Sequence, residues 1–362
     1  MRILVVHPAM GLLGGGERLC CETIRTLLSH GHEITLLTED FNPRAVESFF
    51  GYKELFSKVN LALYPAPRNK AAFGTATHIF SHFRGQSRIL GRLRAFDDDK
   101  FDLMFSSKDP AYFPDMKLPV VQWGYFPRYF HRDFGKSLLK ALRTLPLRLY
   151  YERKILRIGL VLAISNYSKS HLDSVWKRPS TLVYPGCNMI PARAKRDLVV
   201  TVSRASPGKR LEIFWEVARL CSSYEFVMLL TQTEETSEYF EGLSKQRPSN
   251  GMLIVNPDKR TYDQIVGEAK VYLHLMEGEH FGIAVVEAMS AGCVPIVHDS
   301  GGPREIVQDG VGYRWRNVEE IPAMVDRGIR MSPSESAARR ARDFSVDGFQ
   351  RRLSSVLFAL RG

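Results

Sequence analysis

Residues 1–38 read MRILVVHPAMGLLGGGERLCCETIRTLLSHGHEITLLT. The apolar run Ile3–His7 predicts a buried strand, the stretch Gly11–Gly16 a glycine loop, and the apolar spacing of Glu17–Ser29 a helix. A second strand is predicted at His32–Thr38. A strand, a crossover helix and a second strand form a β-α-β unit, which implies a parallel sheet with right-handed crossovers. The chain therefore opens as an α/β fold.

A second series of the same kind begins in the middle of the chain. Pro191–Arg196 is a short connector of proline and basic residues, and Leu198–Ser203 predicts a fresh strand. The loop Arg204–Gly208 and a helical pattern over Lys209–Leu220 follow. Further strands are predicted at Leu103–Ser106, Val120–Gln122, Leu160–Ile164, Phe226–Leu230, Gly251–Val255, Val271–Leu275 and Val294–His298.

These patterns predict two doubly wound, Rossmann-like domains. We place the N-terminal domain at residues 1–190 and the C-terminal domain at 191–345. The amphipathic pattern Val346–Leu360 predicts a helix, and we expect residues 346–362 to pack back on the N-terminal domain. Ligands of such sheets lie beyond the carboxyl ends of the strands, so we expect a site in a cleft that both domains face.

Composition bounds the class of protein. The 362 residues exceed what one core normally organises, and 44% apolar with 25% charged residues is ordinary for a folded chain. The formal net charge of +11 favours an anionic partner: nucleotide phosphates, nucleic acid or an acidic membrane surface. The five cysteines lack the spacing of a zinc site and are interpreted as reduced cytosolic thiols. No apolar stretch approaches the ~20 residues that span a bilayer.

The segment Glu279–Met289 reads EHFGIAVVEAM and links a predicted buried strand to a helix. The first backbone N–H groups of such a helix, with its dipole, can hold a phosphate, and Gly282 allows a ligand close to the backbone. Glu279 precedes the helix, and Glu287 lies one to two turns inside it. A carboxylate accepts hydrogen bonds from two adjacent sugar hydroxyls. By chemistry alone, a helix-start charge and a solvated glutamate remain the alternative.

Two cations and an acidic run are the other candidates. Arg204 and Lys209 flank a Pro-Gly loop just after the first strand of the second domain, where both can point into the cleft; a solvated basic loop is the alternative. The glycines Gly14–Gly16 offer a nest of amides.

The run Asp97–Asp99 suggests a metal-binding motif, but we reject it because the acids precede a strand instead of following one.

The segment Glu279–Met289, followed by Ala291-Gly292, closely resembles the signature of family-4 retaining glycosyltransferases of the GT-B fold. The resemblance spans nearly the whole chain and includes Gly14-Gly15-Gly16-Glu17, His30-Gly31-His32-Glu33, Arg204 with Lys209, and Ser300-Gly301-Gly302-Pro303. It implies a metal-independent enzyme without a cofactor, whose substrate is a nucleotide sugar. The catalytic residues that it implies are Arg204, Lys209 and Glu279. The donor-binding residues are Gly15, Gly16, His280, Phe281, Gly282, Ile283 and Glu287.

Further motifs resemble one branch of this family, the α-1,2-mannosyltransferases that extend dolichol-linked oligosaccharide. They are Leu273–Met276, His298–Pro303 and Val183–Asn188. The implied donor is GDP-mannose. Where that branch carries His-Tyr-Pro or His-Phe-Pro, this chain reads Tyr125-Phe126-Pro127, so a first-domain histidine is replaced. His131 could compensate, although a surface histidine is the alternative.

The acceptor side is expected at Tyr125, Arg128 and the basic, aromatic stretch Arg128–Arg157. Such a mixture on a helical segment suits an anionic bilayer surface, where each cation contributes ~1 kcal/mol. A solvated basic helix that packs its apolar side on the domain remains the alternative.

We therefore expect a glycosyltransferase that moves a hexose, mannose from GDP-mannose, to a glycan or polyprenol-linked acceptor. We expect it in the cytoplasm, peripheral on the cytosolic face of an anionic membrane, with no nucleic-acid partner. Two alternatives stay open: a nucleotide-sugar epimerase on the same fold, and a non-catalytic basic protein that binds membrane or nucleic acid. Transfer to an added acceptor separates the first, and salt-dependent retention of nucleic acid without donor hydrolysis favours the second.

Overall fold

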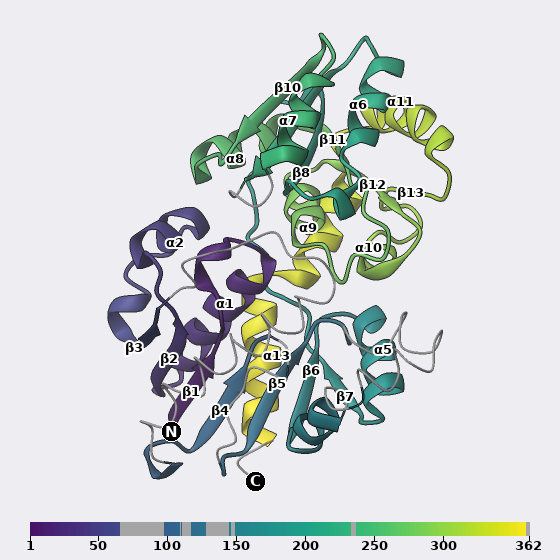
Figure 1. The fold of residues 1–362 in the computed structure, drawn as a ribbon. Helices are drawn as coiled ribbons and strands as arrows, with labels where there is room; N and C mark the ends of the chain where they lie inside the picture. Colours follow the sequence, from purple (N-terminus) through teal and green to yellow (C-terminus); the bar gives the residue numbers. More distant parts are fainter. Residues whose placement is uncertain are drawn as a thin grey trace. The chain divides into compact units, whose positions relative to one another are not determined.

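A computed structural model describes residues 1–65, 98–108, 110, 117–127, 145, 149–232 and 237–359 of the chain. It divides into two units, Met1–Tyr184 with Leu353–Gly362, and Pro185–Arg352. Each unit is built on one parallel sheet with helices packed against it (Figure 1). The division between the units falls six residues before the boundary that we placed after residue 190.

The first unit contains a seven-stranded sheet in the order β3-β2-β1-β4-β5-β6-β7. All neighbouring strands are parallel. The order reverses between β1 and β4, which is the point where such sheets bind ligands beyond their carboxyl ends. The strands are β1 (Arg2–Val6), β2 (Glu33–Glu39), β3 (Asn60–Tyr64), β4 (Leu103–Ser106), β5 (Val120–Gly124), β6 (Leu160–Ala163) and β7 (Ser180–Leu182).

Strand β1 and the helix after the glycine loop form the start of this unit, and alternate side chains of β1 point to the same face of the sheet. Leu4 and Val6 join one buried cluster with Leu37 of β2 and Met104 of β4. The helices of this unit that we name are α1 (Gly15–Ser29), α2 (Pro43–Phe50) and α5 (Asn166–Trp176). Helix α1 contains the predicted segment and starts two residues earlier than the apolar pattern indicated.

The second unit repeats the plan with a six-stranded parallel sheet in the order β10-β9-β8-β11-β12-β13. Here the order reverses between β8 and β11, so the ligand crevice of this unit is expected where these two strands end. The strands are β8 (Arg196–Arg204), β9 (Glu225–Thr231), β10 (Gly251–Val255), β11 (Ala269–Leu273), β12 (Val294–His298) and β13 (Tyr313–Trp315).

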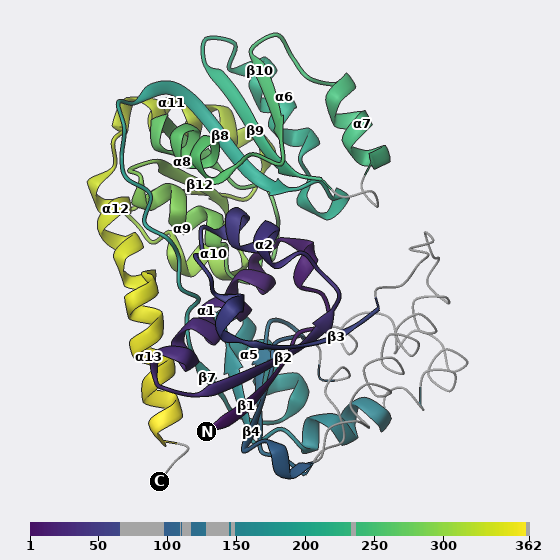
Figure 2. The same cartoon turned by 90° about the vertical axis from the view of Figure 1, so that its left-hand side faces the viewer.

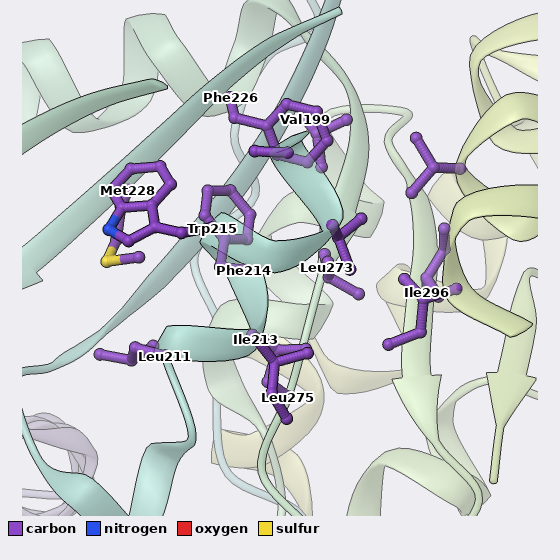
Figure 3. Packing of buried hydrophobic residues seen from close by; sticks show 14 of the residues in the cluster. Val199, Leu211, Ile213, Phe214, Trp215, Phe226, Met228, Leu273, Leu275 and Ile296 are labelled. Atoms are coloured by element: carbon purple, nitrogen blue, oxygen red, sulfur yellow. The ribbon is translucent and has the colours of Figure 1, made fainter. Parts of the chain in front are cut away.

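Aromatic and aliphatic side chains fill one face of this second sheet (Figure 3). The rings of Phe214 and Phe226 meet edge to face with centroids 5.2 Å apart, and the Trp215 Nε1–H donates to the Leu243 carbonyl at 3.0 Å. The buried indole thus keeps its polar group satisfied. Figure 2 shows helices on both faces of the sheet. The helices named in this unit are α6 (Glu212–Leu220), α7 (Ser237–Lys245), α8 (Lys259–Glu268), α9 (Ile283–Ser290), α10 (Gly301–Ile306), α11 (Ile321–Met331) and α12 (Glu335–Ala341).

The last helix, α13 (Val346–Ala359), covers the predicted amphipathic segment up to its penultimate residue. Its residues from Leu353 onward group with the first unit, while the preceding ones group with the second. The side chains of Phe349, Leu353 and Leu357 are buried, as the pattern of an amphipathic helix requires. Within the described part of the chain, no helix combines the length and apolar character needed to cross a bilayer.

The predicted pair of parallel α/β domains is confirmed, and three strands were missed: β3, β7 and β13. All three lie at sheet edges, and the last two are only three residues long. A strand that short carries too little alternation to stand out from its neighbours.

Candidate functional site in the second unit

Glu279 lies where β8 and β11 end, at the point of reversal of the second sheet. Its Oε2 is 2.5 Å from the Nζ of Lys209, which closes the short 3₁₀ helix Pro207–Lys209 after β8. Lys209 Nζ also lies 3.0 Å from the Met276 Sδ. The side chains of Glu279 and Lys209 are 17% and 21% exposed, so the pair is shielded but open to solvent on one side. Two predicted catalytic residues, 70 positions apart in sequence, are therefore in direct contact.

A buried histidine completes this cluster. His274 follows β11, and its Nε2 lies 3.7 Å from the Glu279 Oε2. The indole N–H of Trp315 donates to the His274 carbonyl at 3.2 Å, which fixes the backbone at this point. Burial lowers the pKa of His274 to about 4, although Glu279 opposes the shift. At neutral pH the imidazole is uncharged.

The charge state of Glu279 follows from its neighbours. Burial alone would raise the pKa of Glu279, but the Lys209 ammonium, with a smaller effect of His274, outweighs burial and lowers the pKa to about 2. The group is a carboxylate at any physiological pH. Because it is such a weak base, it is suited to accept hydrogen bonds and unsuited to remove a proton from a hydroxyl.

The backbone around Glu279 is held by the loop that enters α10. The Gly302 N–H donates to the Glu279 carbonyl at 2.7 Å, and the Gly278 N–H donates to the Ser300 Oγ at 2.9 Å. A Cβ on Gly301 would lie 2.3 Å from the Glu279 carbonyl oxygen, and one on Gly302 would lie 2.5 Å from the Phe281 Cα. Only glycine fits at these two positions, which explains the Gly-Gly pair that the sequence pattern included.

Helix α9 begins directly after the loop that contains Glu279. Gly282 is its N-cap with a φ of 104°, a left-handed conformation that favours glycine, and Ile283 is the first helical residue. The first N–H groups of a helix have no partner inside it and are available to a phosphate. The His280 N–H donates to the Glu279 Oε1 at 3.0 Å. Phe281 is buried with its ring against Phe344, so the predicted donor contact of Phe281 can come only from its backbone.

Glu287 lies inside α9, and its side chain is buried. The Tyr262 hydroxyl of α8 donates to the Glu287 Oε2 at 2.6 Å. One carboxylate oxygen is thus tied to the protein, a contact that orients the group. This arrangement is compatible with the predicted recognition of sugar hydroxyls, and it rules out the alternative of a solvated position.

Arg204, the third predicted catalytic residue, is the last residue of β8 and has an exposed side chain. It lies five residues from Lys209 on the same strand-loop segment. Lys209 pairs with Glu279, and Arg210 pairs with Glu277. No ion pair of Arg204 is found among the described residues. Its catalytic role stays a prediction.

The described members of the predicted site in the first unit lie beyond the carboxyl ends of strands β1 and β5. Gly15 and Gly16 are the first residues of α1, and the Tyr125 hydroxyl just after β5 donates to the Gly16 carbonyl at 3.4 Å. Arg128 and His131 lie outside the described residues, as does most of the basic, aromatic stretch to Arg157. Asp98 and Asp99 precede β4, as predicted, and so lie at the amino end of that strand, away from the expected site.

His274 and Tyr262 are site residues that sequence reasoning missed. His274 was quoted only as part of a motif, and Tyr262 was not considered. The position of His274, near the carboxyl end of the strand predicted at Val271–Leu275, could have identified it. Tyr262 carries no such signal, because its partner Glu287 lies 25 residues away on another helix.

Comparison with known proteins assigns this region. Residues 189–340 match the family model described as glycosyl transferases group 1. The chain is 28% identical over 349 residues to a Candida glabrata protein named GDP-Man:Man(3)GlcNAc(2)-PP-Dol alpha-1,2-mannosyltransferase, covering 82% of this chain and 68% of that protein. A Dictyostelium discoideum protein of the same name is 40% identical over 230 residues, or 53% of this chain and 45% of that protein. The match covers 35% of the mouse relative, so the chain spans less than half the length of several relatives that it matches.

Solved structures give the same fold. An Anabaena protein, HepE, crystallised in complex with UDP and glucose, superposes with a TM-score of 0.73 at 16% identity, covering 99% of both chains. Sucrose-phosphate synthase from Thermosynechococcus elongatus gives a TM-score of 0.75 at 13% identity, again over 99% of both chains. The chain has the GT-B fold, and its second unit contains a group 1 glycosyl transferase domain. The predicted GT-B fold is confirmed, and the match of residues 189–340 agrees with the predicted glycosyltransferase.

Proposed function

We propose that this GT-B glycosyltransferase transfers mannose from GDP-mannose to a lipid-linked oligosaccharide, with retention of anomeric configuration and without a metal ion. The observation that carries the proposal is the Lys209–Glu279 pair, 2.5 Å apart, at the strand reversal of the group 1 domain. The relatives' names support the choice of sugar, nucleotide and acceptor class.

Lys209 is placed to neutralise the departing diphosphate. An ammonium has three donors, of which the contacts with Glu279 and Met276 occupy two, so one remains for a phosphate oxygen. Charge that develops on the leaving group is stabilised where a fixed cation and the first amides of α9 are already in place. Arg204, the last residue of β8 and five residues before Lys209, supplies a second positive charge.

Glu279 orients the sugar in this proposal. Its pKa of about 2 keeps it ionised, so it accepts hydrogen bonds from sugar hydroxyls and does not act as the base. The acceptor hydroxyl then attacks the anomeric carbon from the face that the diphosphate leaves, and its proton passes to the leaving phosphate. Glu287, fixed by Tyr262, is left to accept hydrogen bonds from the ribose hydroxyls.

The acceptor suggests that the enzyme works at a membrane surface. A net charge of +11 favours an anionic bilayer, and we propose peripheral binding on its cytosolic face. Within the described end of the basic stretch, Tyr151 and Ile155 are buried and Leu149 and Leu156 are exposed. The exposed leucines supply apolar surface for such contact.

A panel of nucleotide sugars tests the donor assignment without an acceptor. The full chain is incubated with GDP-mannose, UDP-glucose and UDP-N-acetylglucosamine, and release of free nucleoside diphosphate by slow hydrolysis is measured, with Lys209→Ala as control. We expect GDP-mannose to be hydrolysed fastest and Lys209→Ala to be inactive. Faster hydrolysis of UDP-glucose would refute the donor, and hydrolysis that persists in Lys209→Ala would refute the site. Addition of a chelator should leave the rate unchanged.

A further inference from the structure

The first unit contains a cluster of charged residues at its own strand reversal. His7 follows β1 and Lys108 lies two residues beyond β4, and these two strands are neighbours at the point where the sheet order reverses. Helix α1, with Glu17 in its first turn, starts in the same crevice. In doubly wound sheets this crevice is where ligands bind.

Glu17 holds Lys108 in a fixed position. The Lys108 Nζ lies 2.8 Å from the Glu17 Oε1, and the Gly14 N–H donates to the other carboxylate oxygen at 2.7 Å. The Lys108 carbonyl accepts a hydrogen bond from the buried Gln122 side chain. The Glu17 side chain is 3% exposed and that of Lys108 is 28% exposed. The carboxylate is therefore interior, and the ammonium is the end of the pair that meets solvent.

The remaining titratable group of the cluster is His7, which is completely buried. Its Nε2 lies 3.3 Å from the Glu17 Oε1, and neither ring nitrogen forms a hydrogen bond within the described part of the chain. Burial, helped by Lys108, lowers the pKa of His7 to about 3. Since His7 is neutral and Glu17 is a carboxylate, Lys108 is the positive charge that this cluster presents.

Gly16, at the start of α1, lies close to the side chains of Lys108 and Tyr125. Gly15 is exposed, and a Cβ on Gly16 would lie 3.9 Å from the Lys108 Cε and 3.5 Å from the Tyr125 Oη. The first amides of α1, a helix of 15 residues, have no partner inside the helix and carry the positive end of its dipole. A lysine ammonium beside the first amides of a helix matches the donors that a phosphate group requires.

We propose that Lys108 binds a phosphate of a diphosphate-bearing substrate in the first unit, and that Glu17 is the positioning residue that holds it there. The inference rests on the proposed function only for the two sources of that diphosphate, the nucleotide of the donor and the lipid diphosphate of the acceptor. The ligand chemistry is the same in both cases.

Binding measurements on the full chain separate the two sources. Calorimetric titration uses GDP and, separately, geranyl diphosphate as a soluble prenyl diphosphate. The variants are Lys108→Met and the double variant Glu17→Gln/Lys108→Met, which leaves no unpaired carboxylate in the interior; Lys58→Met, at an exposed position, is the matched control. We expect Lys108→Met and the double variant to weaken at least one probe about tenfold, with Lys58→Met unchanged. Loss of GDP alone assigns the donor, loss of geranyl diphosphate alone assigns the acceptor, and loss of both shows that either diphosphate is bound there.

If the ion pair served folding alone, the double variant would melt at a lower temperature but would bind both probes as tightly as the unmodified chain. Lys108→Arg should restore affinity to within about threefold of the original, because the charge is kept. Wild-type affinity of the double variant for both probes, or failure of the unmodified chain to bind either probe, would overturn the proposal. If the variants weaken binding but no mannose is transferred by the unmodified chain, the proposed function fails and this inference stands.

Discussion

The two crevices of the molecule contain the same three kinds of side chain. In the first unit Lys108, Glu17 and His7 meet at the β1/β4 reversal, and in the second Lys209 and Glu279 meet with a histidine at the β8/β11 reversal. In each the glutamate is ionised and the histidine is kept neutral by burial.

The two clusters differ in the position and exposure of the glutamate. Glu17 is fixed inside the first turn of α1 and is 3% exposed, whereas Glu279 precedes α9 in a loop and is 17% exposed. A carboxylate that a ligand must touch needs the second arrangement. The comparison suggests a division of roles: in our proposals the same electrostatic cluster positions a cation in one unit and contacts the sugar in the other.

Acidification should affect both clusters, and this is the largest effect that we expect. The pKa values of His7 and His274, about 3 and about 4, lie below the 6.5 of an unfolded histidine. Below pH 6.5 the unfolded state therefore takes up protons that the folded state refuses, so stability is complete above pH 6.5 and falls as the pH drops toward 4. The loss approaches about 3 kcal/mol per histidine at pH 4, from about 1.4 kcal/mol per pKa unit.

Calorimetric melting at pH 7 and pH 4.5 measures this loss. His7→Gln and His274→Gln should each reduce the difference in melting temperature between the two pH values, while His30→Gln, at an exposed position, should not. A difference that is equal in all three variants would contradict the assignment of neutral, buried histidines.

Replacing the Glu279 carboxylate by an amide tests the role of its charge. Glu279→Gln keeps the shape of the side chain but removes its charge, and we expect turnover to fall about 100-fold because the sugar and Lys209 both lose their partner. The matched control is Glu277→Gln, at a more exposed carboxylate two residues away that pairs with Arg210. Steady-state kinetics with GDP-mannose measures the turnover of both variants. Equal losses in the two variants would show that proximity to the loop, and not the Lys209 contact, matters.

A smaller effect is expected at Glu287, for which we propose contact with the nucleotide. Tyr262→Phe removes the hydroxyl that donates to Glu287, and without this contact the less well oriented carboxylate should bind GDP about threefold to tenfold more weakly. Tyr313→Phe, which removes a hydroxyl that contacts Met331, is the control. Equilibrium titration with GDP reports the change, and an unchanged affinity in Tyr262→Phe would remove Glu287 from the nucleotide site.

Much of the fold follows from local patterns in the sequence. Strands β4, β10 and β12 lie where the apolar runs placed them, residue for residue, because each is a short buried run bounded by loops. Parallel order followed from the alternation of strands and helices. The three missed strands lie at sheet edges, where fewer apolar positions are needed.

Most residues of the candidate site could be predicted from the sequence, but the contacts between them could not. Lys209 and Glu279 were chosen separately, one for the diphosphate and one for the sugar, but their contact depends on β8 and β11 being neighbours. That pairing is a property of strand order, which local spacing does not determine. The cluster around Lys108 escaped notice for the same reason, since His7 and Lys108 are 101 positions apart in the sequence.

The most direct test of the account compares turnover with nucleotide affinity in Lys209→Ala. If Lys209 stabilises the charge that develops on the leaving diphosphate, turnover of GDP-mannose should fall far more than the affinity for GDP, because the interaction strengthens in the transition state. Equal losses in turnover and GDP affinity would contradict the central claim that chemistry takes place at the β8/β11 crevice.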